Sequence, residues 1–161
     1  MRYLIQIALI GILLVSNRAI AEMMTDDLVD GLVTRQSAHS FDATMDKYEA
    51  ALKARGFMIF ARLDHAAAAK SVDLKMPRET VIVFGNPRAG TPAFLKKPTL
   101  AIDLPLKALV WESAEGKVFL SYNSAEYVFG TLFKRHGKSY NKESAAKLET
   151  ALKAIAGQAV K

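Results

Sequence analysis

The chain of 161 residues contains no cysteine. It therefore forms no disulfide, offers no thiolate to a metal ion and has no cysteine nucleophile. A lipoprotein anchor is excluded as well, because acylation at an export-signal junction needs a cysteine. The fold must be stabilised by packing alone.

Histidine is scarce, and its spacing matches none of the common metal-site patterns. The three histidines are His39, His65 and His136, and they form no His-x-x-x-His or His-Glu-x-x-His pair. Methionine is a soft ligand for copper, but Met45 and Met58 also fit apolar core positions. We therefore predict no metal site and no cofactor. An envelope metal-handling or stress accessory is kept as an alternative function.

The first 21 residues follow the pattern of a secretory signal peptide. Arg2 precedes the apolar run Leu4–Val15, and Ala19-Ile20-Ala21 fits an A-x-A cleavage site. As a helix this run would be roughly 18 Å long, which is short against a hydrocarbon core of roughly 30 Å. We predict cleavage after Ala21, a periplasmic or secreted protein, and no stable membrane span in the mature chain. An uncleaved anchor is the alternative.

The rest of the chain is predicted to be a single α+β domain over residues 32–161, preceded by a flexible lead-in at residues 22–31. Cleavage would remove Arg2 and Arg18 but no acid, so the net charge of +6 would fall by two. This modest excess is spread along the chain, and it favours solubility over nucleic-acid binding.

Apolar spacing predicts the elements of the first half of the domain. A strand is expected at residues 32–37, followed by a helix from the N-cap Ser40 to Gly56. Residues 57–63 alternate, with Phe57, Ile59, Ala61 and Leu63 predicted on one face of a strand. Asp64 is expected to cap an alanine-rich helix through residue 70. The continuous apolar run 81–84 predicts a strand buried on both faces.

In the second half, residues 86–92 are dense in turn formers and predict a loop, with a short helical turn at 93–97. Strands at 106–113 and 117–123 form an antiparallel hairpin. Helices are predicted at 125–135 and at the C-terminus, where an apolar stripe ends at Gly157. Helices interspersed with a hairpin-containing sheet indicate an α+β sandwich.

Several segments resemble one family in order. They are Asp64-His65, Val81–Pro92, Pro98–Glu112, Gly116–Asn123 and Arg135-His136. Over roughly residues 39–137 the chain resembles the domain-of-unknown-function 302 family. The resemblance implies an antiparallel sheet with helices packed on one face, similar to the TATA-binding-protein arrangement. It implies no established activity.

Two carboxylates and two histidines are the candidates for acid-base chemistry. Asp64, His65, Asp103 and His136 would act as carboxylate–imidazole pairs if the fold brought them together. Structural roles compete, since Asp64 is placed to cap a helix and Asp103 precedes Leu104-Pro105. A small hydrolase or isomerase that uses His65 or His136 near the Asn86 loop is thus the alternative to a non-enzymatic protein.

The segment Gly85–Gly90 lacks the residues of a P-loop or a dinucleotide-binding turn. It is predicted as a tight turn that leaves a buried strand. The alternative is that this loop forms one wall of a ligand pocket, with Asn86, Arg88 and Thr91 as its polar groups. Our preferred hypothesis is a non-enzymatic, exported module that binds an unknown small ligand or protein. Aromatic residues of the hairpin, such as Trp111 and Phe119, are candidates for an exposed sheet face through which a homodimer would form.

Overall fold

The computed structural model describes residues 31–161 of the chain. The predicted signal peptide, residues 1–21, and the predicted lead-in up to residue 30 lie outside the described residues. Among residues 31–161, no helix has the length and apolar character needed to cross a membrane.

Five strands form one antiparallel sheet in the order β1-β5-β4-β3-β2. Their bounds are β1 Leu32–Gln36, β2 Met58–Asp64, β3 Glu79–Gly85, β4 Leu106–Glu112 and β5 Val118–Asn123. The predicted hairpin is confirmed, because β4 and β5 pair antiparallel around a short turn. The chain therefore has the antiparallel α+β fold that the sequence predicts.

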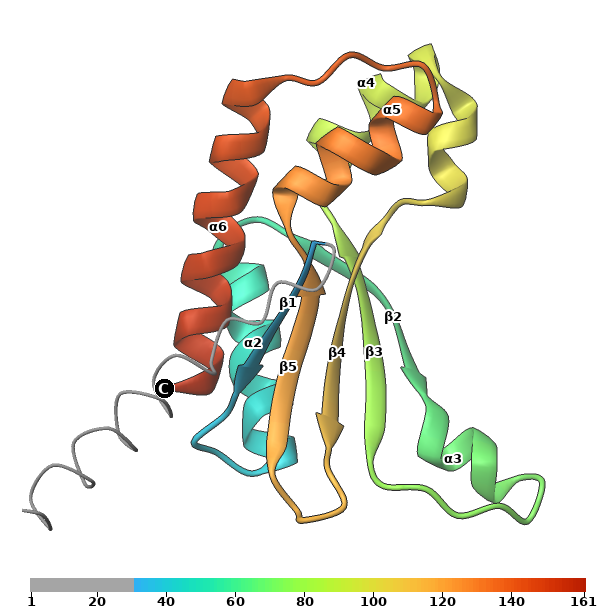
Figure 1. Cartoon of the computed structure of the whole chain (residues 1–161), viewed down its shortest axis with the longest axis vertical. Coiled ribbons are helices and arrows are strands. Elements are labelled where there is room, and N and C mark those ends of the chain that lie inside the picture. The colour runs from blue at the N-terminus through green and yellow to red at the C-terminus, as the bar shows by residue number, and fades with distance from the viewer. Residues whose placement is uncertain (1–30) are drawn as a thin grey trace, which may run out of the picture.

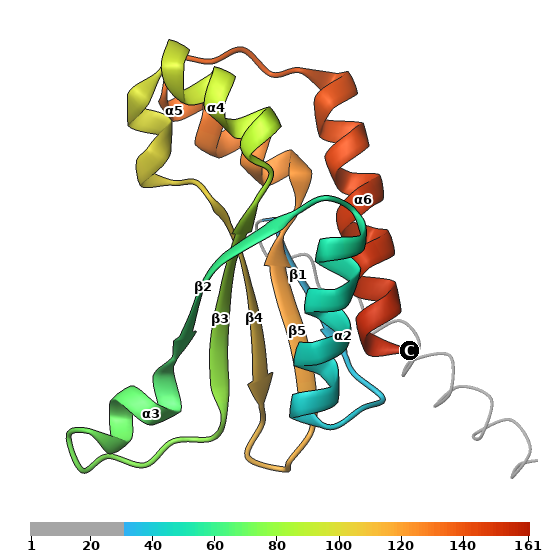
Figure 2. The ribbon, with the colours of Figure 1, turned by 180° about the vertical axis from the view of Figure 1, so that it is seen from behind.

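Two long helices cover one face of this sheet (Figures 1 and 2). They are α2 (Phe41–Ala54) and α6 (Lys142–Val160), which also pack against each other. Ser40 caps α2 as predicted, with its hydroxyl accepting from the Ala43 N–H. The C-terminal helix does not end at Gly157 but continues to Val160, whose carbonyl accepts a hydrogen bond from Ala38 beyond β1.

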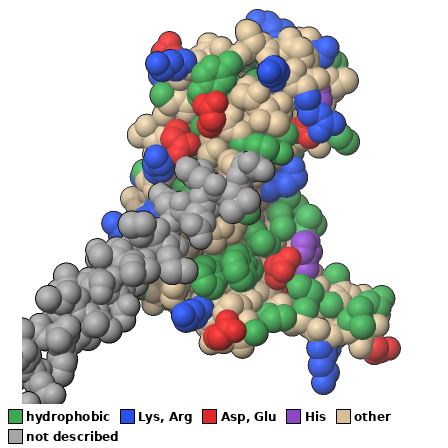
Figure 3. All heavy atoms as spheres, in the orientation of Figure 1, with side chains coloured by type: hydrophobic (Ala, Val, Ile, Leu, Met, Phe, Trp, Pro, Cys, Tyr) green, Lys and Arg blue, Asp and Glu red, His purple; other side chains and the backbone are tan. Residues whose placement is uncertain are grey.

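No helix within residues 31–161 covers the second face of the sheet, and this overturns one prediction. Strand β3 alternates in burial: Ile82 and Phe84 are buried in the core, whereas Val81 and Val83 are only half-buried. The expected burial on both faces is therefore wrong, because α2 and α6 lie on the same side. Figure 3 shows hydrophobic side chains gathered on the helix-free side.

The predicted alternation along β2 is wrong, because a β-bulge interrupts this strand. The register between β2 and β3 shifts between Ile59 and Ala61. Ile59 pairs with Phe84 and packs against the core, whereas Leu63 lies opposite Val81 and is exposed. One extra residue moves every later side chain to the other face, so the four apolar residues do not share a face.

The prediction of a loop at residues 86–92 is also wrong. Residues Pro87–Lys96 form helix α4, with Asn86 as its N-cap and Pro87 at its first position. Proline is favoured there because its missing N–H would have no partner in the helix, and the Asn86 side chain accepts from the Arg88 N–H at 3.0 Å. Turn-forming residues thus act here as a helix start.

The remaining short elements lie at the two ends of the sheet. Helix α3 (His65–Lys70) begins after Asp64, whose carboxylate accepts from the Ala67 N–H at 2.8 Å, as predicted. At the opposite end lie the 3-10 turn η1 (Pro98–Ile102), the π-helical segment η2 (Tyr127–Leu132) and helix α5 (Phe133–Arg135). The helix predicted at 125–135 is confirmed, with a π-helical middle.

A buried carboxylate joins the edge strand to the covering helix. Glu49 on α2 is 5% exposed and pairs with the Arg62 guanidinium of β2, whose Nη2 donates to Oε2 at 2.6 Å. This hydrogen bond, followed by the charge of Glu49, raises the pKa of Arg62. Nearby in the core, burial raises the pKa of the Tyr48 phenol and keeps it protonated.

Replacing Arg62 by alanine is expected to lower the free energy of unfolding by about 2 kcal/mol, because it leaves the Glu49 carboxylate buried with only Lys53 at 3.5 Å. The cost is below that of a fully buried pair, since Arg62 is 57% exposed. Urea unfolding measures it. As a control, Lys147→Ala removes the exposed Glu143 pair and should cost less than about 0.5 kcal/mol. Equal losses of unfolding free energy in the two variants would contradict this role of Glu49.

Candidate functional site

An apolar cavity of about 530 Å³ lies where β2 and β3 approach α4, η2, α5 and α6. Five of the eight phenylalanines line it: Phe57, Phe60, Phe94, Phe129 and Phe133. A volume of this size with a mostly apolar and aromatic lining is typical of sites for small organic molecules. The cavity is therefore the first candidate functional site.

The elements around this cavity are held by specific contacts. The Ala125 N–H, at the start of the helix that contains η2, donates to the Glu149 carboxylate of α6 at 2.9 Å. The π-helical segment is followed directly by α5, and the rings of Phe129 and Phe133 lie 4.6 Å apart. Short π-helical segments occur often at functional sites. Here the segment places two aromatic rings on one wall of the cavity.

Three polar side chains interrupt the apolar lining: Asn86, Ser144 and Lys147. The carbonyl oxygen of Asn86 caps α4, so its amide group remains as a donor towards a ligand. Among residues 31–161, Lys147 is the only titratable residue that lines the cavity. Its side chain forms an ion pair with Glu143, and both side chains are exposed. A site with one ammonium, and with a serine hydroxyl but no histidine or carboxylate to activate it, suits binding better than catalysis.

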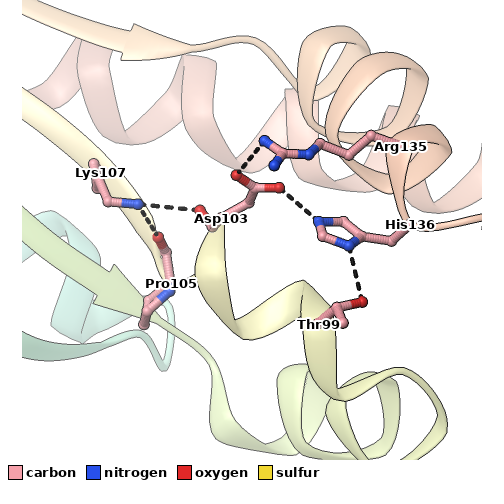
Figure 4. Close-up of polar contacts among 6 residues, drawn as sticks. All are labelled: Thr99, Asp103, Pro105, Lys107, Arg135 and His136. Atoms are coloured by element: carbon pink, nitrogen blue, oxygen red, sulfur yellow. Dashed lines mark hydrogen bonds and ion pairs between the residues drawn. The ribbon is translucent and has the colours of Figure 1, made fainter.

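Thr99, Arg135 and His136 line a second, smaller pocket of about 490 Å³. Asp103 connects these three side chains into one polar set (Figure 4). His136, which follows α5, is buried, and its Nε2 lies 2.6 Å from Oδ2 of Asp103. The other ring nitrogen, Nδ1, lies 3.0 Å from the Thr99 hydroxyl of η1. Arg135 Nη1 donates to the second oxygen of Asp103 at 3.1 Å. Asp103 thus joins η1 to the end of α5.

The backbone next to Asp103 is held from the other side. Lys107 of β4 donates through Nζ to the carbonyl oxygens of Asp103 at 3.1 Å and Pro105 at 3.2 Å (Figure 4). The carboxylate of Asp103 therefore projects from a fixed turn towards His136. Lys97, Ile102 and Gly137 complete the lining of the pocket.

Comparison with known proteins now assigns the fold to a family. The sequence profile described as "Domain of unknown function DUF302" matches residues 33–155. This chain belongs to the DUF302 family. A solved structure, an uncharacterized conserved DUF302 protein from Bacillus stearothermophilus, superimposes with a TM-score of 0.68 and 17% identity. The match covers 81% of this chain and 99% of that one, and at this identity it shows the fold alone.

Several relatives carry a functional name. "Fluoride-specific ion channel FluC 1" of Brucella suis biovar 1 is 38% identical over 124 residues, which cover 77% of this chain and 47% of that protein. "Fluoride-specific ion channel FluC 1" of Brucella abortus biovar 1 matches with the same identity, over 44% of its length. The DUF302 chain therefore spans a little under half the length of these relatives.

The four acid-base candidates of this DUF302 domain fall into two separate places. Asp103 and His136 lie together, as described above. Asp64 and His65 stand where β2 meets α3, at the other end of the sheet, and His65 Nδ1 lies 2.8 Å from Glu79. The two histidines therefore do not act on one substrate group. A catalytic role for any of the four stays a prediction.

The three predicted ligand-binding residues are also separated. Asn86 lines the apolar cavity, whereas Arg88 and Thr91 are exposed on α4 and do not line it. The predicted loop is a helix, and a helix turns successive side chains in different directions. Their role in binding stays a prediction.

Sequence reasoning missed Thr99 and the phenylalanine lining. Thr99 and His136 are 37 positions apart, and no local pattern links them. Phe94, Phe129 and Phe133 lie in segments predicted as a turn or a helix, with no indication that they line one cavity. An excess of phenylalanine over other aromatics was the available signal, with 8 Phe against 5 Tyr and 1 Trp.

The helix-free sheet face carries the aromatic pair of the hairpin. The rings of Trp111 and Phe119 stack 4.5 Å apart, and the Trp111 N–H donates to Ser121 at 3.0 Å. These side chains are half-buried within the chain. Self-association through this face stays a prediction. Within residues 31–161, no group of three or more His, Cys, Asp or Glu lies close enough to hold a metal ion.

Proposed function

We propose that this DUF302 domain is a binding module that holds a small, largely apolar molecule in the phenylalanine-lined cavity. The observation that carries the proposal is the cavity of about 530 Å³ with five phenylalanines in its wall. Burying an apolar ligand there would gain roughly 25 cal/mol for each Å² removed from water. Aromatic rings add specific edge and face contacts to this gain.

The polar side chains of the wall suggest the orientation of such a ligand. The Lys147 ammonium and the Asn86 amide are hydrogen-bond donors, and Lys147 carries a positive charge. A ligand with an apolar body and one anionic or carbonyl group would therefore match the site. An apolar cation would lack a counter-charge, because the lining contains no carboxylate.

We also propose that the domain works outside the cytoplasm. The support is the arrangement of residues 1–21, with a basic start, an apolar run and an A-x-A site. In an extracytoplasmic compartment, a protein without cysteine needs no oxidative folding. An amphipathic ligand would reach the cavity there without crossing the inner membrane.

Fluorescence titration with 8-anilinonaphthalene-1-sulfonate tests the binding proposal. This probe combines an apolar aromatic body with an anionic group, which are the two features that the cavity would recognise. We expect saturable enhancement with one probe per chain, and competition by long-chain carboxylates. Absence of saturable binding by the folded protein would contradict the proposal.

A role in fluoride resistance is a second candidate function. It is favoured by the two relatives named as fluoride-specific ion channels, in which more than half of the chain lies outside the matched region. Within such a relative, the matched region would act as an accessory domain beside the channel. In this chain, a separate domain of the same family would act as a partner protein of a channel. Fluoride resistance would be one form of the envelope stress function that the sequence analysis keeps as an alternative.

Deleting the gene from its source organism is expected to lower the minimal inhibitory concentration of sodium fluoride, because an accessory of fluoride export would be lost. Growth in equal concentrations of sodium chloride is the control. Complementation with the full chain should restore tolerance. Unchanged fluoride tolerance in the deletion strain would argue against this second function.

A further inference from the structure

The hydrogen bonds around His136 fix which ring nitrogen carries the proton. Paired with Arg135, the carboxylate of Asp103 only accepts hydrogen bonds, so the contact of 2.6 Å requires a proton on Nε2 of His136. In a neutral imidazole the other nitrogen then has a free lone pair. Nδ1 is therefore an acceptor, and at 3.0 Å the Thr99 hydroxyl donates to it.

The arrangement of carboxylate, imidazole and hydroxyl is the one that activates a hydroxyl as a nucleophile. A carboxylate orients an imidazole, and the imidazole accepts the proton of a hydroxyl, as in the serine hydrolase triads. His136 is 7% exposed at its side chain and Asp103 14%, so both are held in place. Thr99, in contrast, is exposed to solvent and lines the pocket of about 490 Å³. The group that would attack is thus the accessible one.

We propose that Thr99 is a nucleophile, with His136 as its general base and Asp103 as the positioning residue, and that it accepts acyl groups from small esters that carry an anionic group. Lys97 and Arg135 line the same pocket and supply positive charge for such a substrate. Among residues 31–161, no hydrogen bond or ion pair engages the Lys97 ammonium. It is placed to stabilise an oxyanion or to hold the anionic group.

The reaction balances without a cofactor. The Thr99 Oγ1 attacks the ester carbonyl while its proton passes to Nδ1 of His136. The carbon–oxygen bond of the ester breaks, and the leaving alkoxide takes this proton. Water then attacks the acyl-threonine, its proton passes to Nδ1, and Thr99 Oγ1 regains a proton as the carboxylic acid leaves.

Diisopropyl fluorophosphate tests the nucleophile on the full chain. The hydroxyl oxygen displaces fluoride from phosphorus, and intact mass followed by peptide mapping locates the adduct. We expect one adduct, at Thr99. It should be lost in the isosteric Thr99→Val and retained at the same position in Thr99→Ser. No adduct at position 99 in the wild-type protein would overturn the proposal.

Two further variants separate catalysis from packing. His136→Gln should slow labelling at least about 100-fold, which is the usual contribution of a general base. Asp103→Asn should also slow labelling, since an asparagine amide can donate to Nε2 and so favours the imidazole tautomer that carries its proton on Nδ1, which cannot accept from Thr99. Circular dichroism and the Tm check that each variant is folded. Labelling of His136→Gln at the wild-type rate would overturn the proposal.

His65 provides the matched control at the other end of the sheet. It also lies beside a carboxylate, with Nδ1 2.8 Å from Glu79, but within residues 31–161 its ring makes no hydrogen bond to a hydroxyl that would complete a relay. His65→Gln should therefore leave the labelling rate unchanged. The preference for an anionic ester is read from hydrolysis of 4-nitrophenyl hydrogen succinate against 4-nitrophenyl acetate. Lys97→Gln should reduce this ratio, and an unchanged ratio would remove Lys97 from the site.

Discussion

Replacing Ala151 by tryptophan is expected to raise the apparent Kd for 8-anilinonaphthalene-1-sulfonate at least about tenfold, equal to roughly 1.4 kcal/mol. Ala151 lies on α6 and its side chain lines the cavity. An indole at this position would fill the space that the probe needs, while the rest of α6 keeps its contacts with α2. Fluorescence titration of the purified variant measures the effect.

Ala146 gives a matched control on the same helix. It is exposed on α6 and does not line the cavity. Ala146→Trp adds the same side chain to the same element, so it should leave the probe affinity unchanged. If both variants bound the probe as the wild-type protein does, the probe site would lie elsewhere, for example on the helix-free sheet face.

Replacing Phe84 by alanine is expected to lower the free energy of unfolding by about 4 kcal/mol, as is usual for removing a buried ring from a core. Phe84 is 1% exposed on β3. Its ring makes edge contacts with Tyr48 at 5.9 Å and Phe57 at 5.6 Å between centroids. Denaturant unfolding, followed by circular dichroism, gives the change.

Phe60 is the comparison for Phe84, because it lies on the neighbouring strand and is 48% exposed. Phe60→Ala should cost only about 1 kcal/mol of stability, since about half of its area is exposed to solvent. It should weaken probe binding, because its ring lines the cavity. A loss of stability as large as that of Phe84→Ala would show that the division between core and cavity is wrong.

Much of the fold could be predicted from the sequence, because most elements carry a local signal. The caps Ser40 and Asp64 and the 114–116 turn act over a few residues, and each was predicted correctly. The errors arise where a tertiary feature overrides the pattern. The bulge after Ile59 cannot be read from alternation. The half-exposure of Val81 depends on α2 and α6 sharing one side of the sheet.

The candidate sites could be predicted only in part. Asp103 and His136 were recognised by residue type, and the structure shows that they are partners. Their contact depends on how η1 and α5 meet, which no local spacing encodes. The same holds for the cavity, whose walls come from several elements spread between residues 57 and 151. Asn86 lines the cavity, although its segment is a helix start and not a loop, and its role in ligand binding stays a prediction.

Native mass spectrometry of the protein, purified gently from cells that produce it from the full gene, tests the central claim most directly. The account predicts a chain that begins at Glu22 and carries one small molecule, which is lost under denaturing conditions. Tandem mass spectrometry of the released molecule should show an apolar body with an anionic or carbonyl group. A chain that retains residues 1–21 and carries no adduct, and that also fails to bind the fluorescent probe, would contradict the account.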